Sequence, residues 1–469
     1  MTIDEIVGKL NAIAWGPWML LLLVGTGVYL SCRVGFIQFA RFGYAMSNTL
    51  GKIFKKTQAG EGEVTPFQAV ATALAATVGT GNIAGVTGAI CVGGPGAVFW
   101  MWISALFGMV TKYAEVVLAV RYRERNEQGD WVGGPMYYIR NGLGRGFNWL
   151  AGLFCVLGAL AAFGIGNMTQ VNTIASSINT AIDAFGGNTG AATVTLFGQT
   201  VPVSSIVTGG IVAVIVMLVL FGGIKRIGAV AEKMVPFMAI IYIVAALAVV
   251  LSNLGSLGKI FAMIFQGAFS AEAALGGAFG ITIMTTIQKG VGRGVFSNEA
   301  GLGSAPMAHA ASSERDPVKQ GLYGIFEVFM DTIVICTLTA LTLLCGAGDQ
   351  IVWGQSAGAE LISASFSSVL GPQFGSTLVA VAITLFALST ILSWSLYGTR
   401  CCEFLLGSAA ARVYQVLFVA VILVGATLKL DLVWDIADTL NGFMAVPNLV
   451  ALLGLSPVVI KLTKEHFMK

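Results

Sequence analysis

Charged residues are scarce in this chain. Asp, Glu, Lys and Arg make up 10% of its 469 residues, whereas about a quarter of the residues in a soluble globular protein are charged. Hydrophobic residues make up 56%, and the mean hydropathy is +0.83. This composition excludes a soluble globular fold and predicts a protein that crosses the lipid bilayer many times. The net charge of +3 is too small, and too interrupted by apolar runs, to indicate a nucleic-acid partner.

Histidine and cysteine are rare as well, with two and seven residues. His309 lies in a segment of small residues and His466 lies near the C-terminus, and neither stands in a cluster of serine, cysteine or carboxylate residues. No metal-ligand spacing appears either. Cysteines such as Cys91 and Cys336 fall within apolar runs, which argues against a disulfide framework. We therefore expect neither an enzyme nor a bound cofactor.

Apolar runs of the length needed for a transmembrane helix recur along the chain. About 11 such runs are found, at 15–34, 66–90, 96–120, 148–183, 204–222, 234–252, 260–290, 319–346, 375–398, 410–428 and 435–460. With this set of helices, all but a few of the 26 lysines and arginines fall on one side of the membrane. Lys289 and Arg293 belong to this majority. By the positive-inside rule this side is cytoplasmic. The sequence predicts an all-α polytopic protein with its N-terminus outside and its C-terminus inside.

The order of these runs indicates an internal repeat. Residues 1–65 hold an extra first helix and an inner amphipathic linker, and the remaining ten runs form two sets of five, at 66–253 and 260–461, before a cytoplasmic tail at 462–469. Because five is odd, the second set must enter the membrane in the opposite direction. Transporters with inverted repeats of this kind bind substrate near the membrane midplane, where the first helix of each repeat is interrupted.

Glycines cluster in the first helix of both sets. ATVGTGNIAG (76–85) contains Gly79 and Gly81, and LGGAFGITIMTTI (275–287) contains Gly276 and Gly277. We expect both helices to be interrupted there, with the freed backbone lining a cavity. Close helix packing through glycine is the alternative for either cluster alone. A potassium-channel filter would need a re-entrant loop in a fourfold arrangement, and a phosphate loop would need a Lys-Ser/Thr pair.

Four longer segments resemble a known family. They are GGPGAVFWMWISALFG (93–108), WVGGPMYYI (131–139), FGGIKRIGAVAEKMVPFM (221–238) and GRGVFSNEAGLGSAP (292–306), and they are similar to signature segments of the alanine or glycine:cation symporters, which usually couple to sodium. That family belongs to the amino acid–polyamine–organocation superfamily. The resemblance implies the leucine-transporter fold, with a 5+5 inverted repeat and one extra N-terminal helix. It also implies alanine or glycine as substrate and the plasma membrane of a prokaryote as location.

A buried amino-acid zwitterion needs partners for both of its charges. Backbone N–H groups at the start of a half-helix suit the carboxylate, carbonyl groups of the second interruption and the Gln170 side chain suit the ammonium, and bulky side chains would keep the pocket small. The expected substrate-binding residues are Gly79, Thr80, Gly81, Asn82, Gln170, Gly276, Gly277, Phe279, Ile283, Thr390 and Trp394. Gln170 as a plain interhelical hydrogen-bonding residue is the alternative.

The resemblance further implies two sodium sites, both built from oxygen ligands. The first would use Asn82 and Thr77 together with the substrate carboxylate, and the second would lie between the first and eighth core helices. The residues implied are Ala75, Thr77, Val78, Asn82, Ala387, Thr390 and Ser393. For each serine or threonine the alternative is a hydrogen bond to the carbonyl group of its own helix.

Ionisable residues inside the apolar runs are further functional candidates. Lys112 and Glu115 are spaced to pair on one helical face, Glu327 and Asp331 could form an inner gate or carry a proton, and Glu299 falls in an expected inner loop. The leading hypothesis is a sodium-coupled symporter that imports a small neutral amino acid. Its alternatives are a proton-coupled transporter, which would use a carboxylate such as Asp331, and, less favoured, an ion channel. The sequence does not set the oligomeric state, and a monomer is compatible with this mechanism.

Overall fold

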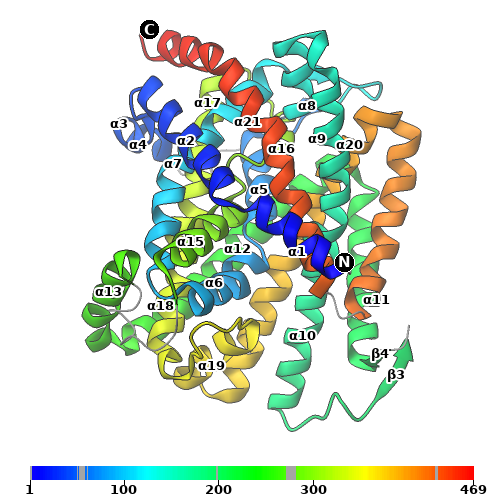
Figure 1. Ribbon diagram of the computed structural model, residues 1–469. Helices are drawn as coiled ribbons and strands as arrows, with labels where there is room; N and C mark the ends of the chain where they lie inside the picture. Colours follow the sequence, from blue (N-terminus) through cyan, green and yellow to red (C-terminus); the bar gives the residue numbers. More distant parts are fainter. Residues whose placement is uncertain are drawn as a thin grey trace.

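The computed structural model is almost entirely helical (Figure 1). The residues that it describes are 3–49, 51, 59–60, 62–196, 199–270, 281–427 and 431–468. The β structure in these ranges consists of two short antiparallel hairpins and one isolated bridge between Val64 and Ser312. The hairpins pair β1 (Glu124–Arg125) with β2 (Trp131–Val132) and β3 (Thr193–Leu196) with β4 (Gln199–Pro202).

The described residues of the N-terminal part form four α-helices outside the expected repeats. The expected extra helix is divided at Gly16 into two helices, and two short helices follow in the segment expected to be an amphipathic linker. These helices are α1 (Ile3–Ala14), α2 (Pro17–Arg33), α3 (Ile37–Ala40) and α4 (Phe42–Thr49).

The first expected set of five runs forms a series of helices with several π-helical turns. They are α5 (Pro66–Thr77), η2 (Gly81–Gly85), α6 (Val86–Gly93), α7 (Ala97–Arg121), α8 (Pro135–Tyr138), η3 (Ile139–Leu143), η4 (Arg145–Phe147), α9 (Asn148–Phe163), η5 (Gly164–Met168), α10 (Thr169–Ala184), α11 (Val203–Leu220) and α12 (Gly223–Ser252). The α5 helix is bent by 49° against the η2–α6 segment, so this span is interrupted at the predicted glycines.

The second set contains two long helices near its end. Its elements are α13 (Leu254–Phe269), α15 (Ile283–Asn298), α16 (Pro306–His309), α17 (Pro317–Val328), η6 (Phe329–Cys336), α18 (Thr337–Gly346), η7 (Gly348–Gln350), α19 (Ala359–Leu370), α20 (Pro372–Thr427) and α21 (Asp431–Phe467). Gly407, with a φ of +85°, is not helical and divides α20 at the point between two expected runs.

Helix interruption in the second set also occurs at a place that we did not expect. The expected run at 260–290 is divided between α13 and α15, and the glycines expected to interrupt it lie outside the described residues. The α15 helix continues to Asn298, and Glu299 then adopts a left-handed conformation with a φ of +55°. Gly301 and Gly303 follow with φ values of +92° and +83°, which α-helical backbone does not allow. The sequence alone places this segment in an inner loop, whereas the structure buries it in the protein interior.

Close packing places α15 against the central helix α7. A Cβ atom on Gly290 would lie 2.5 Å from the Ala97 carbonyl oxygen, and one on Gly294 would lie 2.1 Å from the Ser104 hydroxyl oxygen. Larger residues at these two positions would therefore push the helices apart. This packing fixes the position of the end of α15, where the helix is interrupted, beside the middle of α7.

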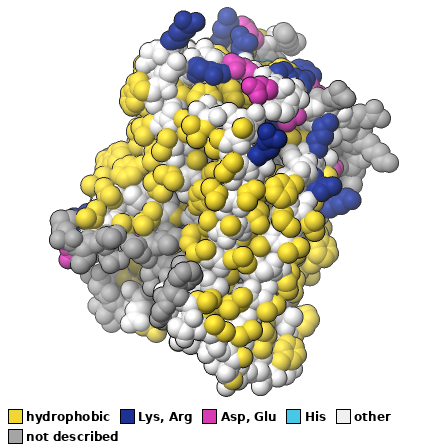
Figure 2. All heavy atoms as spheres, turned by 90° about the vertical axis from the view of Figure 1, so that its right-hand side faces the viewer, with side chains coloured by type: hydrophobic (Ala, Val, Ile, Leu, Met, Phe, Trp, Pro, Cys, Tyr) yellow, Lys and Arg dark blue, Asp and Glu magenta, His cyan; other side chains and the backbone are white. Residues whose placement is uncertain are grey.

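The outer surface matches a membrane environment. Among the described helices, eight are long and apolar enough to cross a membrane, or nine if the bent pair of α5 and η2–α6 is counted as one span. Figure 2 shows hydrophobic side chains over the flank of the molecule and Lys and Arg side chains gathered at its upper end. The C-terminus lies at this upper end in Figure 1. The positive-inside rule would place such an end in the cytoplasm, and the inner position of the C-terminus stays a prediction from this rule.

Candidate functional site

The interruption after α5 is shaped by a glycine and an asparagine. The Gly79 N–H group donates hydrogen bonds to the Asn82 Oδ1 atom, at 2.9 Å, and to the Thr77 carbonyl oxygen, at 3.0 Å. A Cβ atom on Gly79 would lie 2.4 Å from the Thr390 hydroxyl oxygen, a distance too short for any other residue type. Gly79 therefore brings the interrupted backbone directly against α20.

The second interruption, residues 299–305, is held by a buried carboxylate. The Glu115 Oε1 atom accepts hydrogen bonds from the Gly301 and Gly303 N–H groups, both at 3.1 Å, and from the Asn448 side-chain amide, at 2.5 Å. The same amide donates to the Gly301 carbonyl oxygen at 2.8 Å. Backbone groups that the helix no longer satisfies thus find partners on α7 and α21, as buried backbone polar groups must.

Asp331, on η6, joins the two interruptions. Its Oδ1 atom accepts a hydrogen bond from the Asn82 amide at 2.6 Å, and its Oδ2 atom accepts hydrogen bonds from the Ser297 and Thr332 hydroxyl groups, both at 2.8 Å. The carboxylate is fully buried, and no lysine or arginine of the described chain forms an ion pair with it. An anionic oxygen cluster of this kind suits a hard cation such as sodium.

Thr390, on α20, provides a second group of oxygen atoms. Its hydroxyl group lies 3.1 Å from the Ala75 carbonyl oxygen and 3.3 Å from the Ala76 carbonyl oxygen, at the end of α5, and 3.0 Å from the Phe386 carbonyl oxygen of its own helix. Three residues further along α20, the buried Ser393 hydroxyl oxygen has no hydrogen-bond partner among the described residues. The structure therefore brings Thr390 to the carbonyl groups of Ala75 and Ala76, and the second sodium site at this contact stays a prediction.

Three other residues were expected at the sodium sites. Val78, directly after α5, and Ala387, on α20, are both buried. The Thr77 hydroxyl group, however, lies 3.3 Å from the carbonyl oxygens of both Ala73 and Leu74 in its own helix. It thus makes the local hydrogen bond that we considered as the alternative to ion binding.

Gln170 contacts the first interruption from α10. Its Oε1 atom accepts hydrogen bonds from the Thr80 N–H group, at 3.3 Å, and from the Thr80 hydroxyl group, at 3.0 Å. Its amide nitrogen donates to the Ile165 carbonyl oxygen at 2.9 Å. Gln170 is thus in place beside Thr80, and in this structure it serves as an interhelical hydrogen-bonding residue.

A cavity of about 410 Å³ lies beside this interruption, and Thr80 and Gly81 are among its lining residues. Phe296 lines it too and would lie 3.4 Å from a Cβ atom on Gly81. Lys289 and Arg293 also line the cavity. Both lie on α15, which continues past position 290 to Asn298, and the side of the membrane to which the sequence assigned them stays a prediction. The remaining lining residues are Asn11, Trp15, Ala84, Gly85, Gly88, Ala89, Val92, Gly292, Ser356, Ala357, Gly358, Trp434 and Asp438.

Comparison with known proteins decides the family. A model described as the sodium:alanine symporter family matches residues 1–469. The chain belongs to this family. It is 46% identical to the sodium/alanine symporter AgcS of Methanococcus maripaludis, over 99% of this chain and 97% of the relative. It is 36% identical to the probable sodium/glutamine symporter GlnT of Bacillus subtilis, over 99% of this chain and 91% of the relative.

A solved structure supports the fold. The crystal structure of MhsT in complex with L-phenylalanine matches with a TM-score of 0.60 and 13% identity, covering 86% of this chain and 99% of MhsT. The predicted leucine-transporter fold is thereby confirmed. Because the family and these relatives are transporters, the prediction that the chain is not an enzyme is confirmed as well.

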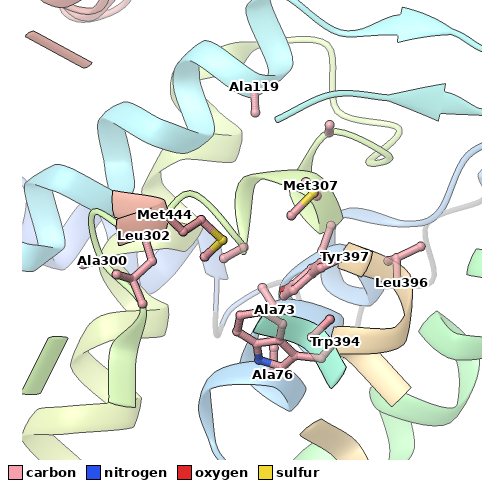
Figure 3. Packing of buried hydrophobic residues seen from close by; sticks show 14 of the residues in the cluster. Ala73, Ala76, Ala119, Ala300, Leu302, Met307, Trp394, Leu396, Tyr397 and Met444 are labelled. Carbon is pink, nitrogen blue, oxygen red and sulfur yellow. The ribbon is translucent and has the colours of Figure 1, made fainter. Parts of the chain in front are cut away.

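The other residues predicted for the substrate pocket do not line this cavity or lie outside the described residues. Trp394 is buried beside Ala73 and Ala76 of α5 (Figure 3) and is not among the residues that line the cavity. Its indole N–H group donates to the Glu299 Oε1 atom at 2.9 Å. Ile283 lies at the exposed start of α15. Gly276, Gly277 and Phe279 lie outside the described residues.

Sequence reasoning missed the partnership of Asp331 with Asn82 and Ser297. It singled out Asp331 only as a gate or proton carrier, because its partners on the chain lie 34 and 249 positions away. A usable signal was present in GRGVFSNEAGLGSAP (292–306), where polar residues and glycines stand within a segment that resembles the family. Sequence reasoning also missed the role of Asn448 in holding the second interruption, because the sequence around Asn448 contains no local signal for it.

Proposed function

We propose that this chain is a sodium-coupled symporter that imports a small neutral amino acid, alanine or glycine, across the plasma membrane of a prokaryote by alternating access. The Asp331 cluster is the observation that supports sodium most directly. A family that includes a sodium/alanine symporter supports the substrate, and relatives from bacteria and archaea support the location. The interrupted helices around one central site are the arrangement on which transporters of this type operate.

The hydrogen bonds of Asp331 favour sodium over a proton as the coupling ion. The Asn82 amide donates to Oδ1, and the Ser297 and Thr332 hydroxyl groups lie within hydrogen-bond distance of Oδ2, so all three can donate to an ionised acid. A buried ionised acid without a cation is costly. A sodium ion at Asp331 would supply the missing charge while all three groups donate to the carboxylate.

The cavity floor supports binding of the amino-acid carboxylate. Thr80 and Gly81, which line the cavity, stand at the N-terminus of the η2–α6 segment, where N–H groups and the helix dipole favour an anion. Gln170 holds the Thr80 backbone in place. A substrate bound there would lie between the Asp331 cluster and the open cavity, so sodium and substrate would be bound at adjacent positions.

Transport into proteoliposomes tests this proposal. We would measure uptake of radiolabelled alanine and glycine with an inward sodium gradient, a matched potassium gradient or a proton gradient. We expect saturable uptake that requires sodium. Uptake driven by protons alone would show the alternative, proton coupling, to be correct, and uptake that never saturates with alanine would indicate a channel.

Two variants locate the ion site. Asp331→Asn keeps the shape of the side chain and removes its charge, so we expect at least a tenfold rise in the sodium concentration that gives half-maximal uptake, from a loss of about 1.4 kcal/mol or more. Asp349→Asn, an exposed aspartate in η7, is the matched control and should behave as the unmodified protein. An Asp331→Asn protein with unchanged sodium dependence would contradict the assignment.

A further inference from the structure

A second buried cluster of charged side chains lies apart from the Asp331 site. Lys112 and Glu115 on α7, Glu299 after α15, His309 on α16 and Glu327 on α17 are all at most 3% exposed. The Lys112 ammonium lies 3.1 Å from the Glu327 Oε1 atom, and the His309 Nε2 atom lies 3.1 Å from the Glu327 Oε2 atom. Four separate segments of the chain thus contribute charge to one water-excluded region.

Negative charge exceeds positive charge in this cluster. Three carboxyl groups, those of Glu115, Glu299 and Glu327, face one lysine and one histidine. The Gln320 amide donates to the His309 Nδ1 atom at 2.9 Å, which leaves the imidazole neutral with its Nε2–H group toward Glu327. Even a charged imidazole would leave one carboxylate without a counter-ion. Because an uncompensated buried anion costs several kcal/mol, at least one carboxyl group must be neutral.

The contacts of the three carboxyl groups identify which one is neutral. Glu327 has a cationic or N–H partner at each oxygen atom. Glu299 accepts from the Trp394 indole at Oε1 and from the Ser304 hydroxyl group at Oε2. Glu115 accepts all three of its hydrogen bonds at Oε1, and its Oε2 atom, fully buried, has no partner among the described residues. Of the six carboxyl oxygen atoms, Oε2 of Glu115 is the one with neither a hydrogen bond nor an ion pair among the described residues, so a proton there displaces no partner.

We propose that this cluster is a proton-binding site, with the proton carried on Glu115, separate from the sodium site at Asp331. A metal ion is a poor occupant, since the Lys112 ammonium already takes the cation position beside Glu327 and only one oxygen atom of Glu115 is free. A proton needs only that one atom. The ionisable groups that act on Glu115 are Lys112, Tyr138 and Glu327. Glu299, His309 and Tyr397 complete the cluster through their interactions with Lys112 or Glu327.

The link between this proton and transport rests on the proposed function. Glu115 holds the N–H groups of Gly301 and Gly303 in the second interruption. If that segment moves during alternating access, Glu115 loses donors that stabilise its ionised form. The proton would then be bound more tightly in the moved state than in the state described here. Sodium-driven uptake should therefore depend on pH through Glu115 without any need for a proton gradient.

Infrared spectroscopy of the purified protein in lipid tests proton binding without any transport. A protonated carboxyl group has a carbonyl stretching band well separated from that of a carboxylate. We expect such a band near neutral pH, its loss as pH is raised, and its absence from Glu115→Gln. Glutamine keeps the accepting oxygen for Gly301 and Gly303, so the variant should fold. Glu465→Gln, at an exposed position, is the control and should keep the band.

Each outcome separates this inference from the proposed function. Absence of a protonated-carboxyl band in the unmodified protein from about pH 5 to about pH 9 would overturn the inference, and a band that persists in Glu115→Gln would overturn the assignment to Glu115. In proteoliposomes, the ratio of sodium-driven uptake rates at about pH 6 and about pH 8 should differ from one in the unmodified protein and approach one in Glu115→Gln. A protein without sodium-driven uptake would refute the proposed function and leave the infrared result standing.

Discussion

Gly79→Ala is the substitution that tests the site geometry most directly. The added methyl group would lie 2.4 Å from the Thr390 hydroxyl oxygen and 3.4 Å from the Gln170 Oε1 atom. Thr390 cannot turn away freely, because a β-branched side chain in a helix has few rotamers and its hydroxyl group is hydrogen-bonded to the Ala75 carbonyl oxygen. The alanine must therefore push α5 away from α20.

The expected cost follows from this overlap. Inserting a methyl group into a packed interior costs about 1–3 kcal/mol, which corresponds to about a 5- to 150-fold change in an equilibrium constant. Because the displaced oxygen atoms of Ala75 and Thr390 are those proposed to bind sodium, we expect the loss to appear as a rise in the sodium concentration for half-maximal uptake. The melting temperature of the protein should fall as well.

The assay compares three variants in the same membranes. Gly210→Ala, on α11, adds its methyl group in open space and should leave uptake and melting temperature unchanged. Thr390→Ala in the Gly79→Ala background removes the clash, so the melting temperature should recover even though sodium binding does not. A Gly79→Ala protein with normal sodium dependence and normal stability would refute the proposed contact between the interruption and α20.

Three further predictions follow from the same structure. Thr390→Val keeps the side-chain shape and removes the hydroxyl oxygen, so the sodium concentration for half-maximal uptake should rise about tenfold or more, and an unchanged value would exclude Thr390 as a ligand. Arg293→Gln removes a guanidinium group from the cavity wall, so the KM for alanine should rise through weaker attraction of its carboxylate, with no change in sodium dependence. Burial alone would raise the pKa of Glu63, but hydrogen bonds from Trp131 and Arg315 have the larger combined effect. The pKa therefore lies below the ordinary value of 4.5. The resulting stability is present above that value and is lost as pH falls through the lowered pKa; the melting temperature should then fall less steeply in acid for Glu63→Gln than for the unmodified protein.

The first interruption could be predicted because its signal is local. Glycines at 79 and 81 stand in the middle of a long apolar run, where they have no role in a plain transmembrane helix other than close packing. Once α5 is interrupted there, the fold brings Thr390 and Gln170 to it. Thr390 and Gln170, which were expected at the site because α5 is interrupted, both contact this interruption in the structure.

The second interruption could not be predicted from the same signal. The expected apolar run ends at position 290, and the segment that follows contains Arg293, Asn298 and Glu299, so hydropathy assigns it to a loop between runs. In the structure residues 299–305 are buried, because Glu115 accepts from the Gly301 and Gly303 N–H groups and Asn448 donates to the Gly301 carbonyl oxygen. These partners lie on two other helices, and nothing in the local sequence reveals that the loop has an interior environment.

The two buried acidic sites differ in how their charge is met, and this difference assigns them different ions. Asp331 has three neutral partners spread over both oxygen atoms and no cation among the described residues, so an ionised Asp331 lacks a compensating charge. Glu115 has its donors on one oxygen atom and stands in a cluster that already holds Lys112, so a proton on its Oε2 atom displaces no donor. A metal ion fits the first site and a proton fits the second. A metal ion at Glu115 would have only one free carboxylate oxygen beside the Lys112 ammonium, which is a poor ligand set for a hard cation.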